Sequence, residues 1–243
     1  MAGLKTALLT LWAPSRALPD AAEQRRFAWP LLLATLIAAL WTALFVQRAD
    51  LIALGEEAVE QMPQEDRAKL TPHEREEKIE TTKKIAVVSA GAKALLAPAF
   101  LALAGAFMLW LGLKVAGGRP GFVASFCVLA HAMLPVSVAR LLSIPALLSR
   151  PSLPVDEAEW LLPSSLAAVV PQAQALSAPR LALLGSVDLF ALWSVALAVL
   201  GMAHVAKVSR LRAGIVVLVL WASFVLVFRF ALPSLTPPGP APS

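Results

Sequence analysis

Five long apolar stretches constrain this chain more than any other feature of its sequence. A helix needs about 20 mostly apolar residues to cross the ~30 Å hydrocarbon layer of a bilayer, and each stretch supplies that number. Lipid offers no partners to backbone N–H and C=O groups, so each crossing is predicted to be an α-helix. The predicted fold class is therefore all-α, a polytopic membrane protein with a bundle of five transmembrane helices. The predicted spans are residues 27–46, 85–113, 122–147, 181–206 and 213–232.

Composition agrees with this fold class. Apolar residues make up 58% of the chain, compared with ~45–50% in soluble domains, and the mean hydropathy is +0.73. The strands of a transmembrane barrel would alternate in polarity, and these stretches do not. Around the membrane domain, 27–232, we expect a cytoplasmic N-terminal segment with an interfacial helix, 1–26, a charged helical loop, 47–84, and a proline-rich disordered tail, 233–243. The role of the loop 149–180 is left open.

The orientation is predicted from the connections, because Lys and Arg near span ends are retained on the cytoplasmic side. The N-terminal segment and the short second and fourth connections are basic, whereas the first connection holds more acidic than basic residues. This pattern places the N-terminus in the cytoplasm and the C-terminus outside. The side chains expected to contact anionic lipid headgroups are Arg25, Arg26, Lys114, Arg119, Lys207, Arg210 and Arg212.

The net charge of +5 does not indicate a nucleic-acid-binding protein. The basic residues stand beside the spans and form no continuous patch, so the lipid bilayer is the expected partner and nucleic acid is not. Cys127 is the only cysteine and lies inside the third span, which excludes an intramolecular disulfide. No cofactor is expected.

The first connection contains a helix start at Thr71, Pro72 and Glu74, with Thr71 as N-cap and Glu74 reaching back to it. We expect this charged helix to continue into the second span. The run from His73 to Glu77 could suggest zinc, but a metalloprotease needs His where Glu77 stands. No metal site is predicted.

Small residues recur on the second and fourth spans and allow close helix contact in lipid. We interpret both stripes as packing surfaces within one molecule, and leave a homodimer seam as the alternative. The predicted packing residues are Ala90, Ala94, Ala102, Ala106, Ala198 and Gly201.

Charged side chains within the spans are costly and are by default candidates for function. Lys93, Arg140 and Asp188 fall at similar depth in the predicted outward half, with Arg229 near the outer end of the fifth span. We predict that Asp188 pairs with Arg140 or Lys93, which leaves open a structural role and a transport role. His131, near mid-membrane, is interpreted as a packing residue. No nucleophile and base can be matched, so no catalytic site is predicted and the chain is not expected to be an enzyme.

The chain resembles the Yip domain family, the Ypt/Rab-interacting proteins and their bacterial relatives. The resemblance rests on Ala13-Pro14-Ser15-Arg16 through Trp29-Pro30-Leu31-Leu32, on Gly117-Gly118-Arg119-Pro120-Gly121-Phe122 leading to Leu134-Pro135, and on Val187-Asp188-Leu189-Phe190 with Trp193, Leu197 and Gly201. It implies five spans, a cytoplasmic N-terminus and an outward C-terminus. Eukaryotic members are similar to adaptors that engage prenylated small GTPases. This chain has no tyrosine and lacks the Asp-Leu-Tyr-Gly-Pro motif, which argues against small GTPase binding and favours a bacterial-type member.

Two functional hypotheses follow. The preferred one is a non-enzymatic integral membrane protein of the bacterial cytoplasmic (inner) membrane that organises lipids or other membrane proteins, with homo-oligomerisation left open. The alternative is a transporter or channel for small solutes, ions or lipids that uses Lys93, Arg140 and Asp188, with His131 deeper along the path. A water-accessible polar cavity would distinguish the second from the first.

Overall fold

The structure is a computed structural model that describes residues 2–171 and 176–231. The described residues form helices and no β-strand, as predicted from the sequence. Five helical segments are long and apolar enough to cross a membrane: 28–46, 72–115, 122–148, 189–206 and 210–231. The predicted all-α bundle of five membrane helices is therefore confirmed.

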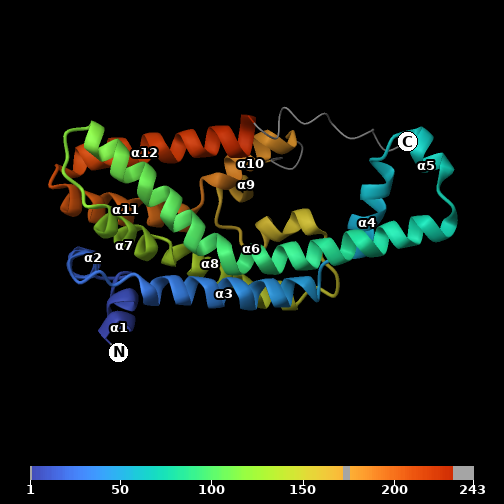
Figure 1. Ribbon diagram of the computed structural model, residues 1–243, viewed down its shortest axis with the longest axis horizontal. Coiled ribbons are helices and arrows are strands. Elements are labelled where there is room, and N and C mark those ends of the chain that lie inside the picture. The colour runs from blue at the N-terminus through green and yellow to red at the C-terminus, as the bar shows by residue number, and fades with distance from the viewer. Residues whose placement is uncertain (1, 172–175, 232–243) are drawn as a thin grey trace.

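The helices run mostly along the long axis of the molecule (Figure 1). Within residues 2–171 and 176–231, two short elements are not α-helical: a 3₁₀ turn, η1 (Val155–Trp160), and a π-helical turn, η3 (Leu226–Ala231), which ends the last span. The α-helices are α1 (Ala2–Leu9), α2 (Pro14–Glu23), α3 (Ala28–Val46), α4 (Leu51–Glu60), α5 (Gln64–Lys69), α6 (Pro72–Val115), α7 (Phe122–Ala132), α8 (Leu134–Leu148), α9 (Leu166–Val169), α10 (Ala178–Ser186), α11 (Leu189–Ala206) and α12 (Arg210–Val225).

Helix α6 is the longest element and begins at the predicted capping box. The Thr71 hydroxyl accepts a hydrogen bond from the Glu74 N–H at 3.3 Å, and the Glu74 carboxylate accepts one from the Thr71 N–H at 2.8 Å. The helix then continues for 44 residues, about 66 Å at 1.5 Å per residue, so the charged loop helix does run directly into the second span. Pro98 lies inside it, which accounts for a local bend, and α6 changes direction along its length in Figure 1.

The main core lies where α11 contacts α7, α12 and α2. Its buried side chains include Leu113, Val128, Leu197, Met202 and Val217. A smaller core forms at the other end of the bundle, where Phe45, Leu147, Leu153 and Leu161 pack together. The two cores place α11 and α8 inside the molecule and leave α3 and α12 at its periphery, with 17% and 11% of their apolar windows buried.

Two of the predicted spans are interrupted. The fourth, 181–206, consists of α10 and α11 with a break at Val187 and Asp188, and only α11 qualifies as a membrane helix. The break is held by backbone bonds from the Leu166 N–H to the Val187 carbonyl and from the Leu189 N–H to the Ser164 carbonyl, both at 3.0 Å. The third span is divided into α7 and α8 at Met133.

The N-terminal residues fold onto the bundle. Helix α2 packs against α7 and α11 and buries Ala17, Leu18, Ala21 and Ala22. Helix α1 contacts α2 and α3, while Trp12, just after it, is 70% exposed. The interfacial role expected for residues 1–26 stays a prediction, but this segment contributes to the core as well.

Candidate functional site

One end of the bundle carries the basic turns, and we call it the basic face. It comprises α1, α2 and the turns 116–121 and 207–209, which lie together at the left of Figure 1. The turns are joined directly, because the Arg119 N–H donates to the Ala206 carbonyl at 3.0 Å. Gly117 and Lys207 adopt left-handed backbone conformations with φ of 82° and 54°. Six of the seven basic residues predicted to contact lipid headgroups are exposed on this face. They are Arg25, Lys114, Arg119, Lys207, Arg210 and Arg212.

Arg26 differs from the other predicted headgroup residues because it makes bonds inside the protein. Its Nη1 donates to Thr6 Oγ1 at 2.7 Å and to Asp20 Oδ2 at 2.8 Å, and the Thr6 hydroxyl donates to the same Asp20 oxygen at 3.0 Å. The guanidinium therefore joins α1 to α2. Lys114 also has an internal contact, with its Nζ 4.3 Å from the Trp110 ring centroid.

Asp188 is a helix cap, and its predicted ion pair is wrong. Its carboxylate accepts hydrogen bonds from the N–H groups of Phe190 at 2.8 Å and Ala191 at 3.2 Å, and the Ser164 hydroxyl donates to its other oxygen. The charge is thus matched to the first turn of α11, where free N–H groups and the helix dipole favour an anion. These bonds also explain why the chain breaks at this residue.

Three of the four charges proposed as a cluster, Lys93, Arg140 and Asp188, form no ion pair with one another within the part of the chain that the structure describes. Lys93 is exposed on α6, and Arg140 is half-buried on α8. Among the described residues, no ion pair includes Lys93, Arg140 or Asp188. Arg229 belongs to the π-helical turn η3.

His131 is fully buried on α7. Its Nδ1 lies 2.8 Å from the Cys127 carbonyl, which requires the proton on Nδ1 and leaves Nε2 as an acceptor. In the described parts of the chain, neither His131 Nε2 nor Ser194 Oγ has a hydrogen-bond partner. The bond to Cys127 orients the imidazole within its own helix and leaves its Nε2 buried without a partner among the described residues.

The small-residue stripes face other helices of the same molecule. Ala94, Ala102 and Ala106 are buried on α6, and Ala90 is half-buried. Ala198 and Gly201 are buried on α11. A Cβ on Gly201 would lie 2.5 Å from Val128 Cγ1, so this contact between α11 and α7 requires glycine.

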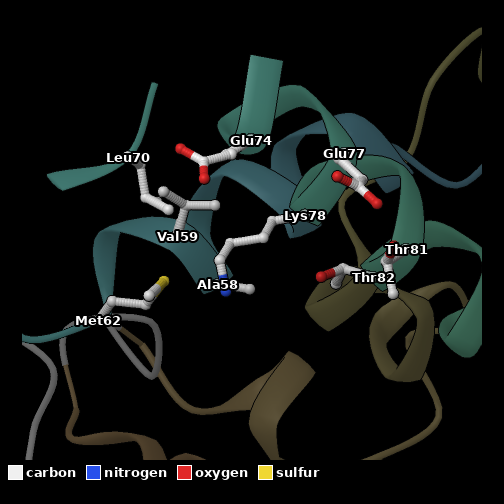
Figure 2. A pocket seen from close by; sticks show the side chains of 9 residues that line it. All are labelled: Ala58, Val59, Met62, Leu70, Glu74, Glu77, Lys78, Thr81 and Thr82. Carbon is white, nitrogen blue, oxygen red and sulfur yellow. The ribbon is translucent and has the colours of Figure 1, made fainter. Parts of the chain in front are cut away.

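An outer pocket of about 500 Å³ lies between α4 and the first turns of α6. Its lining combines the apolar side chains of Val59, Met62 and Leu70 with the charged side chains of Glu74, Glu77 and Lys78. Figure 2 shows the Lys78 side chain extending toward Ala58. The pocket lies before residue 85 of the chain and so outside the predicted hydrocarbon span.

A second pocket, which we call the basic-face pocket, has a volume of about 270 Å³ and lies between α2, α11 and the start of α12. Its polar lining residues are Ser15, His204 and Arg210, and Leu18 and Leu200 contribute apolar walls. In the described parts of the chain, no group of three or more His, Cys, Asp and Glu side chains could hold a metal ion.

These features define the class of the protein. It is an all-α integral membrane protein with five apolar helices, in which Asp188 caps α11 and Trp41 donates to Ser143 on another helix. The family model for the Yip1 domain matches residues 9–231, so the chain belongs to the Yip1 domain family. No curated protein and no solved structure matches it.

Two side-chain interactions at the bundle were not predicted from the sequence. Trp41 Nε1 donates to Ser143 Oγ at 2.8 Å and joins α3 to α8, and Ser164 bonds to Asp188 from the preceding loop. The Asp188 cap had a local signal, since an Asp that precedes an apolar helical run is a typical N-cap. No local signal marked the pairing of Trp41 with Ser143, which are 102 residues apart.

Proposed function

We propose that this protein is a non-enzymatic integral membrane protein that organises lipids or other membrane proteins through its lipid-facing helices. The observation that supports the proposal is that three of the polar side chains in or beside the spans are bonded within the fold. Asp188 caps α11, Ser143 accepts from Trp41, and His131 bonds to Cys127. A transport path needs polar groups that face water, and these three are bonded to neighbouring protein groups instead.

The surfaces available to partners include the outer faces of α3 and α12. On α12, Leu211, Ile215 and Val219 are all exposed and recur every four residues, so they share one face. On α3, Leu32, Leu36 and Leu40 form an equivalent apolar row. These rows are the surfaces on which neighbouring lipids or helices would pack.

The proposed orientation places the basic face in the cytoplasm of a bacterial cell, with α4 and α5 outside the inner membrane. It can be tested by cysteine labelling, because Cys127→Ser removes the single native thiol. An impermeant maleimide is expected to label Glu65→Cys in intact cells and Arg119→Cys only after permeabilisation. If Arg119→Cys is labelled in intact cells and Glu65→Cys only after permeabilisation, the orientation is the reverse of the one proposed. If both variants are labelled in intact cells, α6 does not cross the membrane.

The organising role can be tested by photo-crosslinking in native membranes. A photoreactive residue at Val219, which is 57% exposed, is expected to capture a reproducible protein, or lipids in proportions that differ from the bulk membrane. The same residue at Val217, which is 4% exposed on the same helix, is the matched control. Adducts at Val219 that contain no protein and only lipids in bulk proportions would contradict the proposal.

The transport alternative is tested separately by flux into liposomes. We expect flux equal to that of protein-free vesicles, both for the native chain and for Asp188→Asn. Solute or lipid flux that exceeds this background and decreases in Asp188→Asn would replace the organising role with transport.

A further inference from the structure

The basic-face pocket has the two kinds of surface that a phospholipid needs. Its polar lining residues belong to α2, α11 and the first turn of α12: the Ser15 hydroxyl, His204 and the Arg210 guanidinium. Its apolar walls include Leu18, which is 1% exposed, and Leu200. A ligand in this pocket would therefore contact hydrogen-bond donors and hydrocarbon at the same time.

The position of the pocket suits a ligand at the membrane surface. His204 and Leu200 lie within the last two turns of α11, which ends at Ala206, so the pocket extends to about 9 Å from the helix end at 1.5 Å per residue. Helix α11 has 18 residues, about 27 Å at 1.5 Å per residue, which is close to the ~30 Å thickness of the hydrocarbon layer. The end of α11 is therefore expected near the boundary between headgroups and acyl chains, with Leu200 on the acyl side. A volume of about 270 Å³ is slightly below the range of pockets for drug-sized ligands, and it accommodates a headgroup with its acyl chains outside in the bilayer.

The charges around the pocket favour an anion. Arg210 is exposed and forms no ion pair among the described residues. It is the first residue of α12, whose N-terminal N–H groups add partial positive charge. One group opposes this field: a Glu23 carboxylate oxygen lies 3.7 Å from His204 Nε2. The Glu23 side chain does not line the pocket, so it weakens the attraction without filling the site.

We propose that the basic-face pocket binds one anionic phospholipid, with its phosphate on Arg210 and Ser15, its headgroup next to His204, and the start of its acyl region against Leu18 and Leu200. This inference rests on the proposed function, because it gives the lipid-organising role a defined site. Arginine suits this task because its planar guanidinium donates two parallel hydrogen bonds to phosphate oxygens.

The test is a binding titration of the full-length protein in detergent, read by native mass spectrometry. The probes are dioctanoyl phosphatidylglycerol, dioctanoyl phosphatidylcholine and inorganic phosphate. We expect phosphatidylglycerol to bind more tightly than the other two, and Arg210→Gln to weaken its binding about fivefold, as expected for one basic group near an anionic headgroup. Arg212→Gln is the matched control, because Arg212 is an exposed arginine two residues away that does not line the pocket.

Two further variants test the geometry. Glu23→Gln removes the opposing charge and is expected to tighten binding about two- to fivefold, the range for exposed charges. Ser15→Phe blocks the pocket from an exposed position on α2 and is expected to abolish the preference for phosphatidylglycerol without altering net charge. Ser15→Phe also keeps the proposal testable if Arg210→Gln fails to fold.

The proposal fails if phosphatidylcholine binds as well as phosphatidylglycerol, if Arg212→Gln weakens binding as much as Arg210→Gln, or if Ser15→Phe has no effect. Binding of inorganic phosphate as tight as that of phosphatidylglycerol would overturn the lipid assignment. Any of these results would leave the crosslinking test on α12 unaffected. The experiments can therefore show that the pocket does not bind lipid while the proposed organising role still holds.

Discussion

The contact between Gly201 and Val128 gives the sharpest test of how this bundle is packed. A Cβ on Gly201 would lie 2.5 Å and 2.9 Å from the two Cγ atoms of Val128 and 3.3 Å from its Cβ, while ordinary contacts are 3.4–4 Å. Val128 is fully buried and β-branched, so it cannot rotate away freely. We expect Gly201→Ala to force α11 and α7 apart.

The magnitude follows from two opposing effects. Replacing glycine with alanine within a helix stabilises it by about 0.5–1 kcal/mol, and overpacking a close contact costs about 1–3 kcal/mol. Gly91→Ala on α6 is the matched control, because nothing lies within 4 Å of a Cβ there and only the first effect applies. Gly201→Ala is therefore expected to be about 1–3 kcal/mol less stable than Gly91→Ala.

A double-mutant cycle isolates the contact. Val128→Ala removes both Cγ atoms that would clash and costs about 1–3 kcal/mol alone, roughly twice the cost of losing one methyl group. In the Gly201→Ala, Val128→Ala protein the clash is relieved, so the double variant is expected to be more stable than the sum of the single effects by about 0.5–3 kcal/mol. Reversible unfolding in lipid bicelles by steric trapping measures each free energy. Equal stabilities of Gly201→Ala and Gly91→Ala, or an additive cycle, would refute the reasoning.

Three further predictions concern hydrogen bonds. Asp188→Ala is expected to lower the free energy of unfolding by about 0.5–2 kcal/mol by removing a helix cap, whereas Asp188→Asn keeps the cap and should cost far less; equal losses in the same unfolding assay would favour an ion pair instead. Ser143→Ala removes the acceptor of the Trp41 N–H and should cost about 0.6 kcal/mol, the average for such bonds in membranes, and a loss above ~1.7 kcal/mol would contradict a single-bond effect. The hydrogen bond from the Thr71 N–H lowers the pKa of Glu74 below its ordinary value of 4.5, so the cap stabilises the start of α6 above pH 4.5 and is lost as the pH falls through the lowered pKa. Hydrogen exchange of the first turn should therefore quicken relative to the rest of α6 on acidification in the native chain, and a Glu74→Gln variant should show no such step.

The fold was largely predictable because each span carries its own signal. Twenty apolar residues or more identify a crossing wherever they occur, and Thr71, Pro72 and Glu74 mark a helix start from four consecutive positions. The helix breaks were harder to predict. Asp188 lies inside a long apolar run, and hydropathy alone does not show that its carboxylate caps the first turn of α11, so that a new helix begins there.

Side-chain partners from distant elements were not predictable. Arg26 looks like a headgroup contact in the sequence, because it precedes a span, but its partners Asp20 and Thr6 come from two separate helices. The predicted ion pair of Asp188 failed for a related reason. The sequence predicts that Arg140 and Lys93 lie at the same depth in the membrane as Asp188. A contact also requires that the side chains face each other, and Lys93 is exposed on its helix.

The length of α6 links the two ends of the protein mechanically. A single helix carries the wall of the outer pocket at Glu77 and Lys78 and, some 36 residues further on, Lys114 stacked over Trp110 beside the basic turn. A stiff rod of this kind cannot tilt at one end and stay still at the other, unless it flexes near Pro98. We expect a displacement of α4 and α5 to be passed along α6 toward the turn 116–121, reduced by any bending at Pro98.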